Sequence, residues 1–148
     1  MQNNTFMNSA IIEADMQDIY ERNIPWHALK HQTVLITGAT GMLAGYLVFF
    51  LIHLNEYHQM RIHIMVQVRL PEKAKARFGV YAERDYFSIV THDLRNAWKL
   101  DEAIDYIIHA ASLASPQYYS TIPVEVAEPN VIGTYHLLSL AKEKNVKA

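Results

Sequence analysis

The residues with the clearest chemical signal form a glycine turn, TGATGMLAG, at positions 37–45. This turn lies between a short β-branched run and a long apolar run, as expected of a strand–turn–helix unit. Gly38 lets the chain turn tightly, Gly41 removes a side chain where backbone approaches a phosphate, and the helix start offers unpaired N–H groups. A glycine turn without a ligand is the alternative, but this context favours a dinucleotide. The predicted pyrophosphate contacts are Gly38, Thr40, Gly41, Met42 and Leu43.

The position that reads the cofactor ribose is unusual. An acid about 20 residues beyond the glycine turn commonly bonds the ribose 2′-OH. Here Val68 occupies that position and Arg69 follows it. Valine cannot accept a hydrogen bond, whereas Arg69 offers a charge-assisted partner for a 2′-phosphate and would favour NADP. A solvated surface charge is the other interpretation of Arg69, so the sequence leaves the cofactor as NAD or NADP.

Asp93 and Leu94 directly follow a third expected strand, at residues 87–91. Ligands of open α/β sheets bind outside the carboxyl ends of the strands. Asp93 is therefore predicted to accept a hydrogen bond from the adenine amino group, while Leu94 packs on the ring. A turn or helix-cap aspartate is the alternative.

Strands and helices must alternate to position these residues. Short β-branched runs predict strands, and longer amphipathic or apolar runs predict helices. The expected strands are 33–37, 62–68, 87–91 and 105–109, and the expected helices are 41–55, 71–78, 98–103 and 123–144. Such alternation indicates an α/β fold, a Rossmann-type doubly wound parallel sheet with strand order 3-2-1-4.

The chain divides into two expected parts. Residues 1–30 form an N-terminal helical extension, with a frayed start at 1–9 and an amphipathic helix at 11–20. Residues 31–148 form an NAD(P)-binding Rossmann domain that is incomplete, since the sequence stops where a fifth strand would begin. The fourth strand is then expected to expose an unpaired edge, which predicts self-association through that edge or through helix 123–144.

Composition excludes several classes of protein. The net charge is −2 with scattered Lys and Arg, there is no Cys, and the eight His show no metal-ligand spacing. These features argue against nucleic acid, a membrane surface and a metal site. The start has no signal-peptide pattern, and the apolar run at 43–54 is shorter than the roughly 20 residues of a bilayer span. We expect a cytoplasmic protein.

Several segments together resemble one family, the extended short-chain dehydrogenase/reductases that include NAD-dependent epimerases and dehydratases. They are the glycine turn, Asp93-Leu94, HAAS at 109–112 and NVIGT at 130–134. The segment HAASLASPQY at 109–118 most resembles UDP-glucuronate decarboxylases and nucleotide-sugar 4,6-dehydratases. Those enzymes usually carry an acid where Val68 stands.

The resemblance implies roles for further residues. It implies that Ala110, Ala111 and Ser112 line the cofactor, and that the helix at 123–144 is half of a dimer interface. It also implies a substrate side, which would comprise Ser115, Pro116 and Tyr118.

The resemblance further implies a function for the parent protein. That protein would bind a nucleotide sugar and oxidise it at C4 by hydride transfer to NAD(P)+. The catalytic Ser/Thr and the Tyr-x-x-x-Lys pair of the family lie beyond residue 148, so this chain is expected to be inactive, with no catalytic residue of its own. The alternative from another class is a non-catalytic protein that senses a dinucleotide with the same fold.

Overall fold

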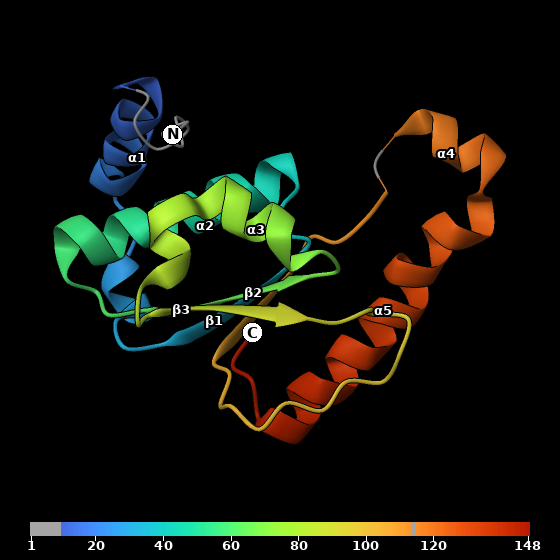
Figure 1. The fold of residues 1–148 in the computed structure, drawn as a ribbon. Coiled ribbons are helices and arrows are strands. Elements are labelled where there is room, and N and C mark those ends of the chain that lie inside the picture. Colours follow the sequence, from blue (N-terminus) through green and yellow to red (C-terminus); the bar gives the residue numbers. More distant parts are fainter. Residues whose placement is uncertain (1–9, 114) are drawn as a thin grey trace.

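The computed structural model describes residues 10–113 and 115–148. Four parallel strands form one sheet, in the order β3-β2-β1-β4 (Figure 1). Their bounds are β1 (Thr33–Thr37), β2 (His63–Val68), β3 (Phe87–Thr91) and β4 (Tyr106–His109). The structure therefore confirms both the fold class and the strand order expected from the sequence.

Helices cover both faces of the sheet (Figure 1). Helices α2 (Met42–His58) and α3 (Pro71–Phe78) lie on one face, and α5 (Pro123–Lys144) lies on the other. Helix α1 (Ala10–Glu21) packs on α2, and α4 (Pro116–Thr121) precedes α5. Two 3-10 turns, η1 (Trp26–Leu29) and η2 (Gly79–Glu83), complete the described elements.

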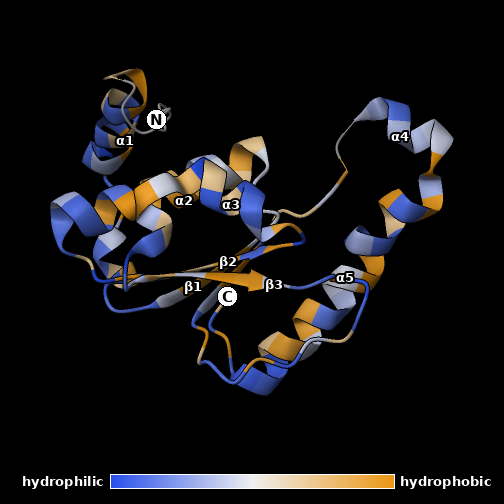
Figure 2. Cartoon of the chain, in the orientation of Figure 1, coloured by the Kyte–Doolittle hydropathy of each residue, from blue (hydrophilic) through white to orange (hydrophobic). Residues whose placement is uncertain are grey.

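Successive side chains of a strand point to opposite faces of the sheet, so alternate residues pack in two separate cores. On the α2 side, Val34, Ile36 and Ile64 join the apolar residues of α2 and α3. On the α5 side, Leu35 and Met65 pack with α5 residues. In Figure 2 the strands are largely apolar, whereas α5 mixes polar and apolar residues. The α2 core is the larger of the two, so α5 keeps more of its surface open.

The N-terminal helix is held firmly against α2. Met16 of α1 is fully buried. The Tyr20 ring of α1 stacks on the His58 ring of α2 at a centroid distance of 3.5 Å. The Tyr46 hydroxyl donates a hydrogen bond to Asp15. Within the described residues, no helix combines the length and the apolar character needed to cross a bilayer. The expected fraying of residues 1–9 concerns positions outside the described part of the chain.

Two local predictions are wrong. Residues 98–103 contain no helix. Trp98 is buried and its ring stacks on the His92 ring at a centroid distance of 4.7 Å, so this tertiary contact, and not a helical repeat, places the segment. Conversely, α4 was not predicted, although Pro116 follows an extended Ser115 and so occupies a favourable first helical position.

The prediction that the edge of β4 is unpaired is also partly wrong. The Lys147 N–H donates to the Asp105 carbonyl at 2.9 Å, and the Ile107 N–H donates to the Ala148 carbonyl at 2.9 Å. The Lys147 ammonium also pairs with the Asp105 carboxylate at 2.8 Å. The last residues thus run beside β4 in the same direction and occupy part of the edge.

Candidate functional site

Three polar residues lie in one row across the carboxyl end of the sheet. Thr37 of β1 is in register with Gln67 of β2 and with His109 of β4. Thr37 and Gln67 are only 0 % and 2 % exposed. Buried polar side chains need hydrogen-bond partners, and these find theirs in the loops that leave the strands. The row therefore fixes the loops that surround the carboxyl edge.

The glycine turn leaves β1 directly above this row. Gly38 has a φ of +65°, and a Cβ there would lie 2.6 Å from Ala111 Cα, so only glycine fits. The Gly41 N–H donates to the Gly38 carbonyl at 2.8 Å, which closes the turn. Gly41 then caps α2 in an extended conformation without a side-chain hydrogen bond. The first N–H groups of α2 are left for an external anion.

Thr37 joins the turn to the loop after β4. Its hydroxyl oxygen accepts N–H bonds from Ala110 at 3.1 Å and Ala111 at 3.3 Å, and it lies 2.8 Å from His109 Nδ1. His109 Nε2 lies 3.2 Å from the Pro129 carbonyl, which can only accept. Nε2 therefore carries the proton, Nδ1 accepts, and the Thr37 hydroxyl donates to it. This chain of bonds connects β1, β4 and α5.

Gln67 joins the turn to the loop after β3. Its Oε1 accepts the Gly38 N–H at 3.4 Å, and its Nε2 donates to the His92 carbonyl at 2.5 Å. The next residue, Val68, is 4 % exposed at the end of β2. Sequence reasoning missed Gln67, although an amide between two valines at the end of a largely apolar strand was a usable signal.

Asp93 is already held by an arginine. Arg95 Nε lies 3.0 Å from both carboxylate oxygens, and its Nη2 lies 2.6 Å from Oδ2. Hydrogen bonding from Arg95 lowers the pKa of Asp93 to about 2, and the charge of Arg69 acts in the same direction. Arg95 also pairs with Glu128 of α5 at 3.4 Å. The adenine contact predicted for Asp93 stays a prediction, and Arg95 was not anticipated.

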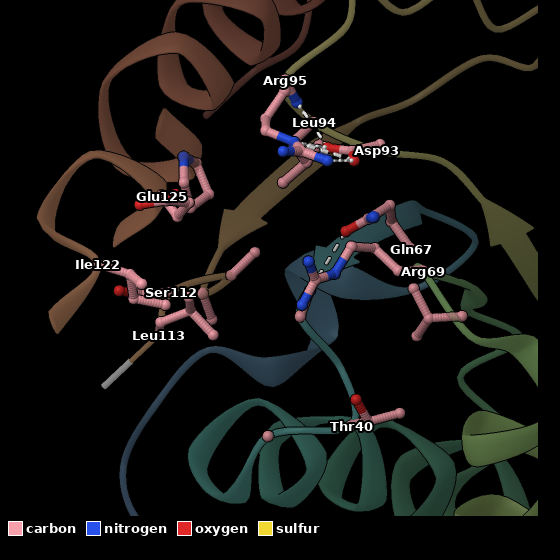
Figure 3. Close-up of a pocket in the computed structure, with 16 residues that line it drawn as sticks. Thr40, Gln67, Arg69, Asp93, Leu94, Arg95, Ser112, Leu113, Ile122 and Glu125 are labelled. Atoms are coloured by element: carbon pink, nitrogen blue, oxygen red, sulfur yellow. Dashed lines mark hydrogen bonds and ion pairs between the residues drawn. The ribbon is translucent and has the colours of Figure 1, made fainter. Parts of the chain in front are cut away.

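One cavity of about 450 Å³ brings most of the predicted residues together (Figure 3). Nine predicted residues line it: Gly38, Thr40, Gly41, Arg69, Asp93, Leu94, Ala110, Ala111 and Ser112. Seven others also line it: Gln67, Val68, Arg95, Leu113, Ile122, Glu125 and Pro129. In Figure 3 Arg69 extends into the cavity, and Ser112, Leu113, Ile122 and Glu125 lie on the opposite side.

Five predicted residues do not line the cavity. Met42 and Leu43 begin α2 and are 77 % and 73 % exposed, so the cofactor contacts predicted for them fall to their backbone N–H groups. Ser115 precedes α4, Pro116 begins it and Tyr118 lies within it. The α4 residues are thus displaced from the glycine turn along the chain that leads to α5.

The cavity fits a nicotinamide dinucleotide by its own geometry. The glycine turn brings its backbone to the cavity without side chains, the start of α2 has no side-chain cap, and Arg69 supplies a cation near the end of β2. No group of three or more metal-ligating side chains occurs within residues 10–113 and 115–148. The family comparison agrees with this ligand class, since residues 34–148 match the model of the NAD dependent epimerase/dehydratase family. The chain belongs to this family.

Two similar proteins are named for nucleotide sugars. UDP-glucuronic acid decarboxylase 6 of Arabidopsis thaliana is 30 % identical over 113 residues, which cover 76 % of this chain and 31 % of that protein. UDP-glucose 4-epimerase of Rickettsia canadensis is 27 % identical over 121 residues, covering 78 % and 34 %. The chain thus spans about a third of the length of these relatives.

Solved structures share the fold. Pen from Bacillus thuringiensis superposes with a TM-score of 0.66 at 24 % identity, covering 80 % of this chain and 36 % of that one. UDP-N-acetylglucosamine 4-epimerase from Methanobrevibacter ruminantium gives 0.61 at 20 % identity, covering 80 % and 36 %. Yeast reductase Gre2, solved with NADPH, gives 0.51 at 22 % identity, covering 76 % and 33 %.

Proposed function

We propose that this chain binds a nicotinamide dinucleotide at the carboxyl edge of its sheet. The observation that carries the proposal is the glycine turn, where Gly38 can bear no side chain and the start of α2 has no side-chain cap. The α2 N–H groups bind the pyrophosphate, and the 93–94 loop flanks the adenosine. Ala110, Ala111 and Ser112 follow β4 and line the path toward the nicotinamide.

The cofactor carries a 2′-phosphate in this proposal. Val68 offers no acceptor to a ribose hydroxyl, and Arg69 extends into the same cavity (Figure 3). No ion pair within 4.0 Å joins Arg69 to another described residue. Asp93, which would repel a phosphate, is neutralised by Arg95. These charges support NADP over NAD.

The whole protein acts on a nucleotide sugar in this proposal. The named decarboxylase and epimerase relatives support that substrate class. The bound dinucleotide would accept a hydride from C4 of the sugar, and a dehydration, decarboxylation or epimerisation would follow. Ser115, Pro116 and Tyr118 would border the sugar. No tyrosine among the 148 residues has a lysine four positions later, so these residues bind the cofactor without turnover.

A non-catalytic sensor of dinucleotides is the second candidate, because the same fold and the same cavity would serve it. The full-length sequence of the protein separates the two. A Ser/Thr on the next strand and Tyr-x-x-x-Lys on the next helix support the enzyme, and a full-length chain without them supports the sensor.

Calorimetry with NAD+ and NADP+ tests the binding proposal. Gly41→Val places methyl groups where the pyrophosphate approaches, and a Cβ there would already lie 3.2 Å from the Gly38 carbonyl. Ala127→Val on the exposed surface of α5 is the matched control. We expect binding by the wild type and the control, and at least tenfold weaker binding by a folded Gly41→Val. Absence of heat from the wild type, or equal affinities of all three proteins, contradicts the proposal.

A further inference from the structure

Gln67 contacts both the glycine turn and the loop after β3. Its amide reaches the Gly38 N–H on one side and the His92 carbonyl on the other, and its side chain also lines the cavity. The first contact lies in the pyrophosphate turn, and the second lies one residue before Asp93. Three segments that are far apart in the sequence are thereby joined through one side chain.

Burial of the Gln67 amide costs hydration free energy, and the hydrogen bonds of the sheet ladder do not offset that cost. Gln67 is 2 % exposed, and Met65, which points to the same face of β2, packs in the apolar core under α5. An amide in such a place loses its hydration and needs polar partners. Both of its partners are backbone groups of the cofactor loops, and neither belongs to the ladder of the sheet.

The orientation of the amide suits these partners. The oxygen faces an N–H donor, and the nitrogen faces a carbonyl acceptor. A carboxylate at this position would lose the donor toward His92 and would add a negative charge below the pyrophosphate. An apolar side chain would leave both backbone groups without these bonds. A neutral amide of this length accepts from Gly38, donates to His92 and adds no charge below the pyrophosphate.

We propose that Gln67 is a positioning residue that couples the glycine turn to the 92–94 loop and holds the pyrophosphate and adenosine subsites at a fixed spacing. The inference rests on the proposed function, because the spacing matters only if a dinucleotide spans the two loops. Gln67 acts through Gly38 and His92 rather than as a catalytic residue.

The test separates this role from a purely structural one. Gln67→Met keeps a similar length without hydrogen bonds, and Gln67→Glu keeps only the acceptor. Met16→Ala is the control, since it removes buried contacts under α1 away from the site and lowers stability there. Affinities for NADP+, which spans both loops, and for adenosine, which contacts one, are measured well below each melting temperature.

We expect Gln67→Met to bind NADP+ about tenfold more weakly, the effect of roughly one hydrogen bond. Gln67→Glu should bind more weakly still, because of its charge, while adenosine affinity changes less than twofold in both variants. Met16→Ala should melt earlier but bind NADP+ as the wild type does. If Gln67→Met binds NADP+ like the wild type, or loses NADP+ and adenosine equally, the inference is overturned.

Hydrogen exchange of backbone amides provides a readout without any ligand. In Gln67→Met the Gly38 amide should exchange faster, and the NMR signals of both Gly38 and Asp93 should shift, whereas Met16→Ala should leave them in place. Unchanged Gly38 and Asp93 signals overturn the coupling itself. If these signals shift but the wild type binds no dinucleotide, the coupling is upheld and the proposed function has failed.

Discussion

Thr37 and Gln67 lie opposite each other in register on β1 and β2, and each buried side chain holds a loop outside the sheet. Thr37 accepts two N–H groups from the loop after β4, and Gln67 bonds the loop after β3. The central strands therefore contribute both apolar side chains to the core and hydrogen bonds to the loops. Their last side chains fix the distance between the two walls of the cavity.

Thr37→Val tests the first of these connections. Valine has the same shape but cannot accept the N–H groups of Ala110 and Ala111 or bond His109, so buried polar groups lose their partner. We expect a loss of about 1–3 kcal/mol in the free energy of unfolding. Urea denaturation measures it. Thr91→Val, at the exposed end of β3, is the control and should change stability little. Equal effects of the two changes would show that the Thr37 hydroxyl contributes nothing specific.

Arg69→Ala tests the choice of cofactor. If Arg69 pairs with the 2′-phosphate, the variant should bind NADP(H) more weakly by roughly 1.5–3 kcal/mol, the range of a charge-assisted hydrogen bond. NAD(H) affinity should barely change. Lys75→Ala, on the exposed side of α3, controls for the loss of a surface cation. Calorimetry at two salt concentrations measures both cofactors. Equal losses for NAD(H) and NADP(H) would show that Arg69 does not read the 2′-group.

Acid should destabilise the fold around His53 of α2. His53 is 3 % exposed, and its pKa is lowered first by burial and then by the charge of His58, while Glu13 acts in the opposite direction. The unfolded chain therefore takes up the proton at a higher pH than the folded one does. Stability is full above the unfolded pKa of about 6.5 and falls as the pH drops below it.

His53→Phe measures this contribution. Phenylalanine keeps an aromatic ring beside Tyr57 and Phe50 but cannot take up a proton. We expect the free energy of unfolding to fall less steeply between pH of about 7 and 5 than in the wild type, by at most about 1.4 kcal/mol per pH unit. The exposed His27→Gln should keep the wild-type slope. A His53→Phe slope equal to that of the wild type would exclude His53 as the source.

The sequence predicted features formed by contiguous residues, but it did not predict contacts between residues far apart in the chain. The turn from Gly38 to Gly41 was predictable because its glycines, the strand before it and the helix after it are contiguous. The bond from Gln67 to His92 spans 25 positions, and the pairing of Arg95 with Glu128 spans 33. Such contacts depend on how the strands and α5 are placed in space.

The two helix errors have different origins. The spacing of apolar residues at 98–103 suggested a helix, but the stacking of Trp98 on His92 overrides that local preference. Ser115 and Pro116 form a local helix-start signal, but the helix that follows them has only six residues, too few for an apolar repeat to show. At the β4 edge, residues 147–148 provide hydrogen-bond partners, and a segment of two residues is too short to show a strand pattern in the sequence.

Self-association is expected through the β4 edge or through α5. Residues 147–148 occupy part of that edge, which leaves α5 as the more open of the two surfaces. On α5, Val131, Tyr135 and Leu138 are 67 %, 69 % and 66 % exposed and follow helical spacing, while Leu137 faces the sheet. An apolar stripe of this kind on a soluble protein commonly packs against another surface.

We therefore propose that two copies associate through this stripe of α5. Leu138→Lys places a charge in its centre, where burial would be costly, and should shift the assembly toward monomer. Gln17→Lys adds the same charge on the exposed side of α1 and should leave the assembly intact. Light scattering and sedimentation over a range of concentrations give the mass. A wild type that stays monomeric at high micromolar concentration would refute association, and an assembly that survives Leu138→Lys would place the contact elsewhere than on this stripe.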